Sequence, residues 1–169
     1  MSKAKWHYDF NIISHRGVFS VTKNLSYHKK LEDLPILIQR DGGFYSPQSF
    51  DQFIILDSAV GIIKNVKKLG YLCVVISNQP DISRGYLKQT ELDKMTDVLY
   101  KELYIDDVFY CTHDDSDKCN SRKPAPGLLL QAADKWNINL DKSYMIGDTL
   151  KDVEAAKCAN VKYFLLNSC

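Results

Sequence analysis

The sequence has almost no excess of either charge, since 22 lysine and arginine residues stand against 21 aspartate and glutamate residues. This balance argues against the basic surface that nucleic acids and anionic membranes attract. The chain also lacks an apolar run near the roughly 20 residues that a transmembrane helix needs, and its first residues lack the apolar core of a signal peptide. We therefore expect a cytoplasmic protein whose ligand is a small molecule or another protein.

The number of cysteines is odd, and a disulfide framework is not expected. Five cysteines in 169 residues do not indicate a disulfide framework. Only Cys111 and Cys119, which bracket His113, have a spacing that favours a metal site. Internal repeats, low-complexity tracts and linkers are missing as well, so the length predicts one ordinary globular domain.

Short apolar stretches alternate with segments of helical periodicity. Continuous β-branched or aromatic runs predict buried strands at 34–38, 71–76, 144–146 and 161–166, with a weaker candidate at 107–110. Helices are expected from Asp57 or Ser58 to Gly70, from Thr90 through Leu103, from near Pro124 to Trp136, and from Thr149 to Ala159. This alternation predicts an α/β fold with a doubly wound parallel sheet over residues 34–169. Residues 1–33 do not follow it and form a predicted N-terminal extension with a β-hairpin around Arg16-Gly17.

Polar residues follow the predicted strands, at the edge where open α/β sheets bind ligands. The segments in question are Gln39-Arg40-Asp41, Ser77-Asn78-Gln79 and Gly147-Asp148, with Lys123 just before the third helix. A hydroxyl, a lysine and carboxylates converging on one edge suit a phosphate group held together with a divalent cation.

Four ordered segments carry a more specific pattern. They are Ile38-Gln39-Arg40-Asp41-Gly42-Gly43, Val75-Ile76-Ser77-Asn78-Gln79, Arg122-Lys123-Pro124-Ala125-Pro126-Gly127, and Met145-Ile146-Gly147-Asp148 with Asp152. Their order and spacing resemble the motifs of the haloacid-dehalogenase (HAD) phosphatases, in the branch of the histidinol-phosphate and heptose-bisphosphate phosphatases. The resemblance implies a three-layer Rossmann-like fold with a small loop cap. It also implies a small phosphorylated metabolite, a sugar phosphate or histidinol phosphate, as ligand.

The resemblance gives each matching residue a role. Asp41 would be the general acid, and the phosphoryl group and substrate would be bound by Ser77, Asn78, Arg122 and Lys123. Magnesium would be held by Asp148 and Asp41, with support from Asp152. Taken alone, Asp41 and Asp148 would be turn or cap residues, Lys123 would be a solvated loop lysine, and Asp152 would complement a helix N-terminus.

Gln39 departs from the pattern at the reacting atom. The family uses an aspartate here, as nucleophile and magnesium ligand, whereas a glutamine amide is a poor nucleophile and a weaker ligand. We therefore predict a phosphatase-family domain that keeps its phosphate and magnesium scaffold with hydrolysis impaired or lost, and that serves as a phosphosugar-binding or partner-regulating protein. The alternative is an active magnesium-dependent phosphomonoesterase in which Asp41 orients water. A third alternative is a structural module without ligand.

A second departure concerns zinc. This branch commonly carries a Cys-x-His loop followed by Cys-x-Cys, and here Cys111, His113 and Cys119 match while Ser121 takes the fourth place. A closed structural zinc site needs four ligands. Either water or a nearby carboxylate would complete it, from Asp114, Asp115 or Asp117.

Overall fold

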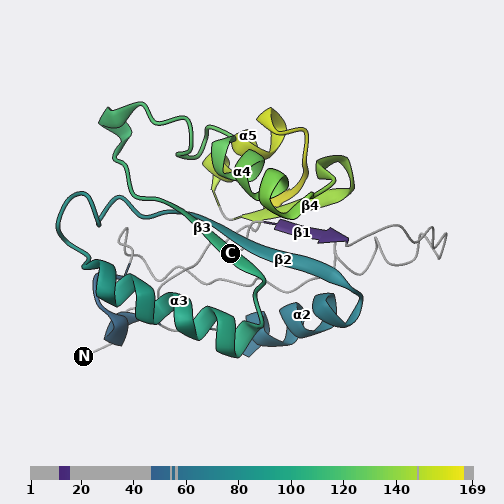
Figure 1. Cartoon of the computed structure of the whole chain (residues 1–169), viewed down its shortest axis with the longest axis horizontal. Coiled ribbons are helices and arrows are strands. Elements are labelled where there is room, and N and C mark those ends of the chain that lie inside the picture. Colours follow the sequence, from purple (N-terminus) through teal and green to yellow (C-terminus); the bar gives the residue numbers. More distant parts are fainter. Residues whose placement is uncertain (1–11, 16–46, 54, 56, 148, 166–169) are drawn as a thin grey trace.

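The computed structural model describes residues 12–15, 47–53, 55, 57–147 and 149–165. Its five-stranded sheet has the order β3-β2-β1-β4-β5. Helices α2 (Asp57–Lys68) and α3 (Gln89–Leu103) lie on one side of the sheet, and α4 (Gly127–Trp136) and α5 (Leu150–Cys158) lie on the other (Figure 1). The predicted three-layer α/β arrangement is confirmed.

The sheet contains two parallel pairs joined by an antiparallel strand. Strand β2 (Tyr71–Asn78) pairs in parallel with β3 (Asp107–Cys111), and β4 (Ser143–Gly147) pairs in parallel with β5 (Lys162–Leu165). Strand β1 (Ile12–His15) lies between β2 and β4 and runs antiparallel to both. The prediction of a parallel sheet therefore needs correction at β1. This strand precedes the β-α-β series along the chain, so no helical crossover requires it to run parallel.

The N-terminal extension thus contributes a strand to the sheet. Its predicted hairpin has one arm in β1, which pairs with β2 and β4. The other arm, at 18–21, and the predicted strand at 34–38 lie outside the described residues. Three short 3-10 helices complete the described elements: η1 (Phe50–Gln52), η2 (Asp115–Asp117) and η3 (Leu140–Lys142).

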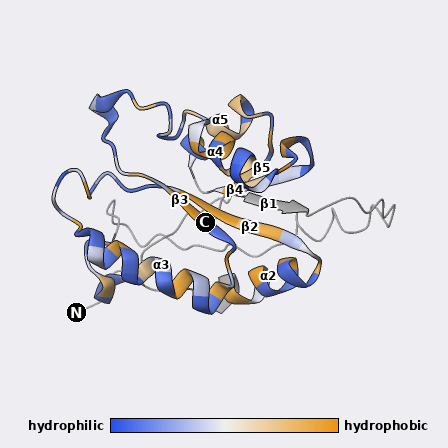
Figure 2. Cartoon of the chain, viewed as in Figure 1, coloured by the Kyte–Doolittle hydropathy of each residue, from blue (hydrophilic) through white to orange (hydrophobic). Residues whose placement is uncertain are grey.

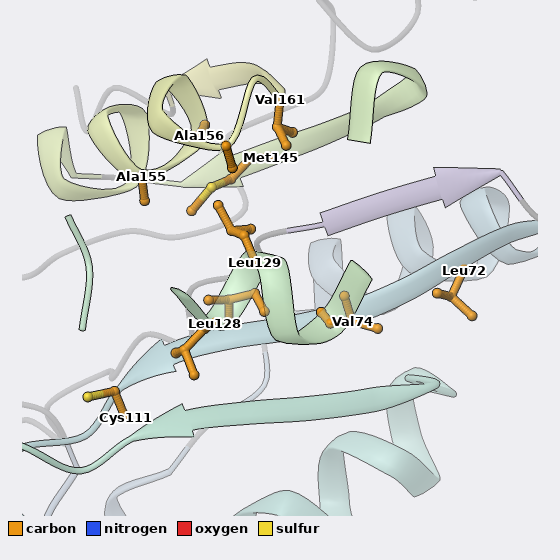
Figure 3. Close-up of a cluster of buried hydrophobic side chains, with 12 residues drawn as sticks. Leu72, Val74, Cys111, Leu128, Leu129, Met145, Ala155, Ala156 and Val161 are labelled. Carbon is orange, nitrogen blue, oxygen red and sulfur yellow. The ribbon is translucent and has the colours of Figure 1, made fainter. Parts of the chain in front are cut away.

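The helices bury the faces that their periodicity predicts. On α3, the four residues Leu92, Met95, Leu99 and Leu103 are at most 1% exposed and pack with Val75 of β2. A second core lies on the opposite face of the sheet, where Leu128 and Leu129 of α4 meet α5 and β2 (Figure 3). Figure 2 shows the resulting apolar β2 and β3 between helices whose outer faces are hydrophilic.

The ends of the helices follow local sequence rules. Gly70 adopts φ 84° two residues after the end of α2, the left-handed conformation that a glycine allows at low cost. Thr149 and Asp152 form a reciprocal capping box at the start of α5. Among the described helices, none combines the length and apolar character needed to cross a bilayer.

Candidate functional site

The described candidate residues gather at one edge of the sheet. Loops leave the carboxyl ends of β2 and β3 on the same side of the molecule (Figure 1), and Ser77 and Asn78 end β2. The loop before α4 brings Lys123 to Asn78, and the first turn of α5 brings Asp152 to Lys123. Three predicted residues, Gln39, Asp41 and Asp148, lie outside the described residues.

Lys123 is a buried lysine whose charge is matched inside the protein. Its Nζ lies 2.7 Å from Oδ1 of Asp152, and both side chains are 2% exposed. The same Nζ donates a 3.0 Å hydrogen bond to the carbonyl of Ile76 on β2. A buried cation is tolerated only with such partners. The pair therefore holds the ammonium group of Lys123 at the carboxyl edge, with its charge balanced by Asp152.

Asn78 holds the backbone of Lys123. Its Nδ2 donates to the carbonyl of Lys123, and its Oδ1 accepts from the N–H of Lys123, each at 3.0 Å. This two-way contact ties the end of β2 to the loop that contains the cis peptide between Lys123 and Pro124. Sequence analysis predicts Asn78 as a substrate ligand, whereas its amide oxygen and nitrogen are engaged here with the main chain of Lys123.

Asp152 connects three elements. Its Oδ2 accepts hydrogen bonds from the N–H of Thr149 at 3.0 Å and from the Thr149 hydroxyl at 2.6 Å, while Oδ1 faces Lys123. Gly147, at the end of β4, makes room for this carboxylate, because a Cβ there would lie 2.4 Å from Cβ of Asp152. With both oxygens engaged, Asp152 supports the site through Lys123, and direct ligation of magnesium would require it to leave that contact.

Ser77 is a buried hydroxyl at the same edge. It is 3% exposed, and its Oγ accepts a 3.2 Å hydrogen bond from Nε2 of Gln79. Gln79 is also 3% exposed, and its backbone N–H donates to the carbonyl of Cys111 at 2.7 Å. The end of β2 is thereby joined to the end of β3.

Arg122 adds a second cation beside Lys123. Its Nε donates to Oδ1 of Asp115 at 2.7 Å, and its Nη1 donates to the carbonyl of His113 at 2.9 Å. Lys151 of α5 approaches the same Asp115 oxygen at 3.5 Å. Arg122 lowers the pKa of Asp115, an exposed carboxyl, by hydrogen bonding. Asp115 thus forms ion pairs with both Arg122 and Lys151 next to the site.

Arg84 forms a separate ion pair in the same region. Its Nε and Nη2 each donate to a carboxylate oxygen of Asp114 at 2.6 Å, which is the bidentate geometry that favours arginine. This contact, with help from the N–H of Asp115, lowers the pKa of Asp114 to about 2. The loop after β2 is therefore joined to the loop after β3.

Cys111, His113 and Cys119 come together as a metal-binding group. Their ligand atoms all lie within 4.8 Å of one another, with 3.7 Å between Cys111 Sγ and His113 Nδ1 and 3.9 Å between the two sulfurs. Two thiols and one imidazole are a donor set that zinc prefers. Burial raises the pKa of the Cys111 thiol, whereas the Ser121 N–H lowers the pKa of Cys119. The donor atoms fit zinc.

The predicted fourth ligands are engaged elsewhere. Asp114 binds Arg84, Asp115 binds Arg122, and Oδ2 of Asp117 accepts from the N–H of Asp114. The hydroxyl of Ser121 accepts a 2.8 Å hydrogen bond from Gln131. Among the alternatives that the sequence leaves open, this arrangement favours water as the fourth ligand.

Three residues make contacts with candidate site residues that the sequence did not predict. Gln79 contacts Ser77, Asp115 contacts Arg122, and Thr149 contacts Asp152. The sequence predicts Asp115 only as a candidate zinc ligand, because its partner Arg122 lies seven residues away in an irregular loop. The one available signal was for Thr149, which begins a Thr-x-x-Asp capping box.

Curated relatives share much of this chain. It is 33% identical over 146 residues to the D-glycero-beta-D-manno-heptose-1,7-bisphosphate 7-phosphatase of Pasteurella multocida, covering 78% of this chain and 79% of the relative. It is 35% identical over 136 residues to the protein of the same name from Helicobacter pylori, covering 77% and 78%.

A solved structure and a family model agree with these relatives. The structure of D,D-heptose 1.7-bisphosphate phosphatase from B. bronchiseptica, complexed with magnesium and phosphate, aligns with a TM-score of 0.69 at 27% identity, covering 77% of this chain and 74% of that one. The model of the haloacid dehalogenase-like hydrolases matches residues 19–160. The chain therefore belongs to the haloacid dehalogenase-like hydrolase family.

Proposed function

We propose that this protein binds a small phosphorylated sugar at the carboxyl edge of its sheet and hydrolyses it slowly or not at all. The observation that carries the proposal is the buried Lys123–Asp152 ion pair beside the buried hydroxyl of Ser77. A buried lysine is costly to maintain, and its position at a sheet edge that binds ligands in open α/β folds gives it a use.

The residues at the carboxyl edge of the sheet would each contact a different part of the phosphorylated ligand. Lys123 supplies a fixed positive charge, and Ser77 supplies a hydroxyl that can donate to a phosphoryl oxygen. Arg122, held by Asp115 and His113, supplies a planar guanidinium for the rest of the ligand. Positioning and charge of this kind are what phosphoryl groups mainly require from a protein.

The sugar phosphate as ligand is supported by the relatives, whose name specifies a heptose bisphosphate. Histidinol phosphate is the second candidate, from the resemblance of the four motifs. If the domain binds its ligand without hydrolysing it, we expect a protein partner that responds to the bound state.

The loss of hydrolysis follows from Gln39. A carboxylate in this place would attack phosphorus, whereas a neutral amide is a poor nucleophile. The chain retains Asp41 two residues later, and this aspartate supports a second candidate, an active phosphomonoesterase in which Asp41 orients water.

Two metals belong to the proposal. Magnesium, held by Asp148 and Asp41 with Asp152 in support, would neutralise charge on the phosphoryl oxygens. The solved relative, complexed with magnesium and phosphate, supports magnesium as the cation. Zinc would be held by Cys111, His113 and Cys119, with water as the fourth ligand.

The test compares the unmodified protein with Gln39→Asp in the presence of magnesium. Phosphate release is measured from a panel of sugar phosphates, heptose bisphosphate and histidinol phosphate. Release by Gln39→Asp alone, with binding by both proteins, would support the proposal. Release by the unmodified protein that disappears in Asp41→Asn would establish the second candidate instead. If neither protein binds the ligands or releases phosphate, the third alternative, a structural module that binds no ligand, would be supported.

A further inference from the structure

Gln79 has a buried side chain with a single polar contact among the described residues. Its Nε2 donates to the hydroxyl oxygen of Ser77 at 3.2 Å. Its Oε1 is buried without a hydrogen-bond partner in the part of the chain that the structure describes. A buried polar side chain of this kind costs stability. Its one contact therefore calls for a reason other than stability.

The direction of this hydrogen bond determines what Ser77 can do. An amide nitrogen can only donate, so the Ser77 oxygen must be the acceptor. The hydroxyl proton of Ser77 is then left for another acceptor, and the described residues offer it none. A phosphoryl group presents only acceptor oxygens at its surface. Ser77 is thus prepared as a donor to phosphate.

The backbone around Gln79 is also fixed. Its N–H donates to the carbonyl of Cys111 at 2.7 Å, and its own carbonyl accepts from the N–H of Ile82 at 3.3 Å. These contacts hold the main chain of Gln79 in one place relative to β2 and β3. From this position the buried side chain donates to Ser77, and that contact can restrict the rotation of the Ser77 hydroxyl.

We propose that Gln79 is a positioning residue that orients the Ser77 hydroxyl toward the bound phosphoryl group. This inference rests on the proposed function, because it requires a phosphoryl group beside Ser77. Gln79 itself acts through Ser77 and does not touch the ligand.

The experiment is a titration with inorganic phosphate, in the presence of magnesium, of the full chain and six variants. The variants are Gln79→Met, Ser77→Ala, Ser77→Thr, the two double variants that combine Gln79→Met with Ser77→Ala or with Ser77→Thr, and the control Gln89→Met. Methionine keeps the length of glutamine without its amide. Gln89 is a matched control, since it also donates through Nε2, to Asp93, but on the exposed start of α3. Unfolding midpoints are measured in parallel.

We expect Ser77→Ala to weaken phosphate binding by about tenfold and Gln79→Met to weaken it by about threefold. In the Ser77→Ala background, Gln79→Met should have no further effect, because the hydroxyl it orients is gone. In a Ser77→Thr background, which keeps a hydroxyl, the effect should return. Gln79→Met should not lower the unfolding midpoint, since it removes a buried acceptor without a partner.

The outcomes separate the inference from the function on which it rests. No phosphate binding by the unmodified protein would overturn both. Binding that Gln79→Met leaves unchanged, or weakens equally with and without Ser77, would overturn the inference alone. Weaker binding that parallels a lower unfolding midpoint would assign Gln79 a structural role and overturn it as well.

Discussion

The amino group of Lys123 and the carboxylate of Asp152 form an ion pair at 2.7 Å from which solvent is almost completely excluded. The two residues are 29 positions apart and come from different elements, the loop before α4 and the first turn of α5. Taking two charges out of water is costly, and a single buried charge without its partner is costlier still. The integrity of the binding edge therefore depends on Asp152 as much as on Lys123.

Replacing Asp152 with asparagine should destabilise the fold strongly. The substitution keeps the shape of the side chain but leaves a buried lysine without its counter-charge, which typically costs about 3–5 kcal/mol. The free energy of unfolding from urea titration measures this. Lys94→Ala is the control, since it removes the exposed Lys94–Glu91 pair, and it should have no measurable effect. Equal effects of the two substitutions would contradict the importance assigned to the buried pair.

Asn78→Leu should weaken phosphate binding by displacing Lys123. The side chain loses both hydrogen bonds to the Lys123 main chain, each worth about 0.5–1.5 kcal/mol. Stability and phosphate affinity should therefore fall together, as measured by urea titration and phosphate titration. If affinity falls while stability is unchanged, Asn78 contacts the ligand directly, as the sequence motif alone suggests.

Zinc should protect two of the cysteines from alkylation. Cys111 and Cys119 lie within reach of one ion, whereas Cys158 is exposed and distant in sequence from the group. With zinc added, mass spectrometry after iodoacetamide should show Cys111 and Cys119 unmodified and Cys158 alkylated. Ser121→Cys should make zinc harder to remove with a chelator, because it offers a third thiolate. Equal alkylation of all three cysteines with and without zinc would count against the site.

The Arg84–Asp114 pair should contribute to acid sensitivity. Because the pKa of Asp114 in the folded protein is about 2, below the value of about 3.9 for an unfolded chain, the contribution is fully present above about pH 4. It is lost as the pH falls through about 2. Unfolding titrations at pH 7 and pH 3 should show a smaller loss of stability for Asp114→Asn than for the unmodified protein. The same loss in both proteins would mean that other carboxyls account for the acid sensitivity.

The fold was predictable because its helices and strands are regular. Leu92, Met95, Leu99 and Leu103 recur at helical spacing and are buried together, and the continuous apolar run at 71–76 supplies most of the buried part of β2, which is 72–77. The direction of β1 was not predictable, since two adjacent isoleucines carry no information on which strands flank them.

For the described residues of the candidate site, the sequence predicted that they lie at one edge but not which contacts they make. The motifs placed Ser77, Asn78 and Lys123 together, and the structure brings them to one edge. The partner of Asn78 could not be predicted, because it contacts main-chain atoms of Lys123, which every residue type has. The sequence placed Gln79 only among the polar residues after the strand, and its contact with Ser77 could not be predicted, since an amide two residues from a serine has no distinctive spacing.

Asp107, at the opposite end of β3, has a consequence for behaviour in concentrated solution. Its carboxylate accepts from Trp136 at 2.6 Å, lies 2.7 Å from Lys135 Nζ, and accepts from Tyr100 at 3.3 Å. Strand β3 is an edge of the described sheet, and an uncovered edge invites pairing with a second chain. Asp107 therefore holds Tyr100 of α3 and Lys135 and Trp136 of α4 at the start of this edge strand, and charged side chains at an edge strand are one means by which proteins limit such pairing.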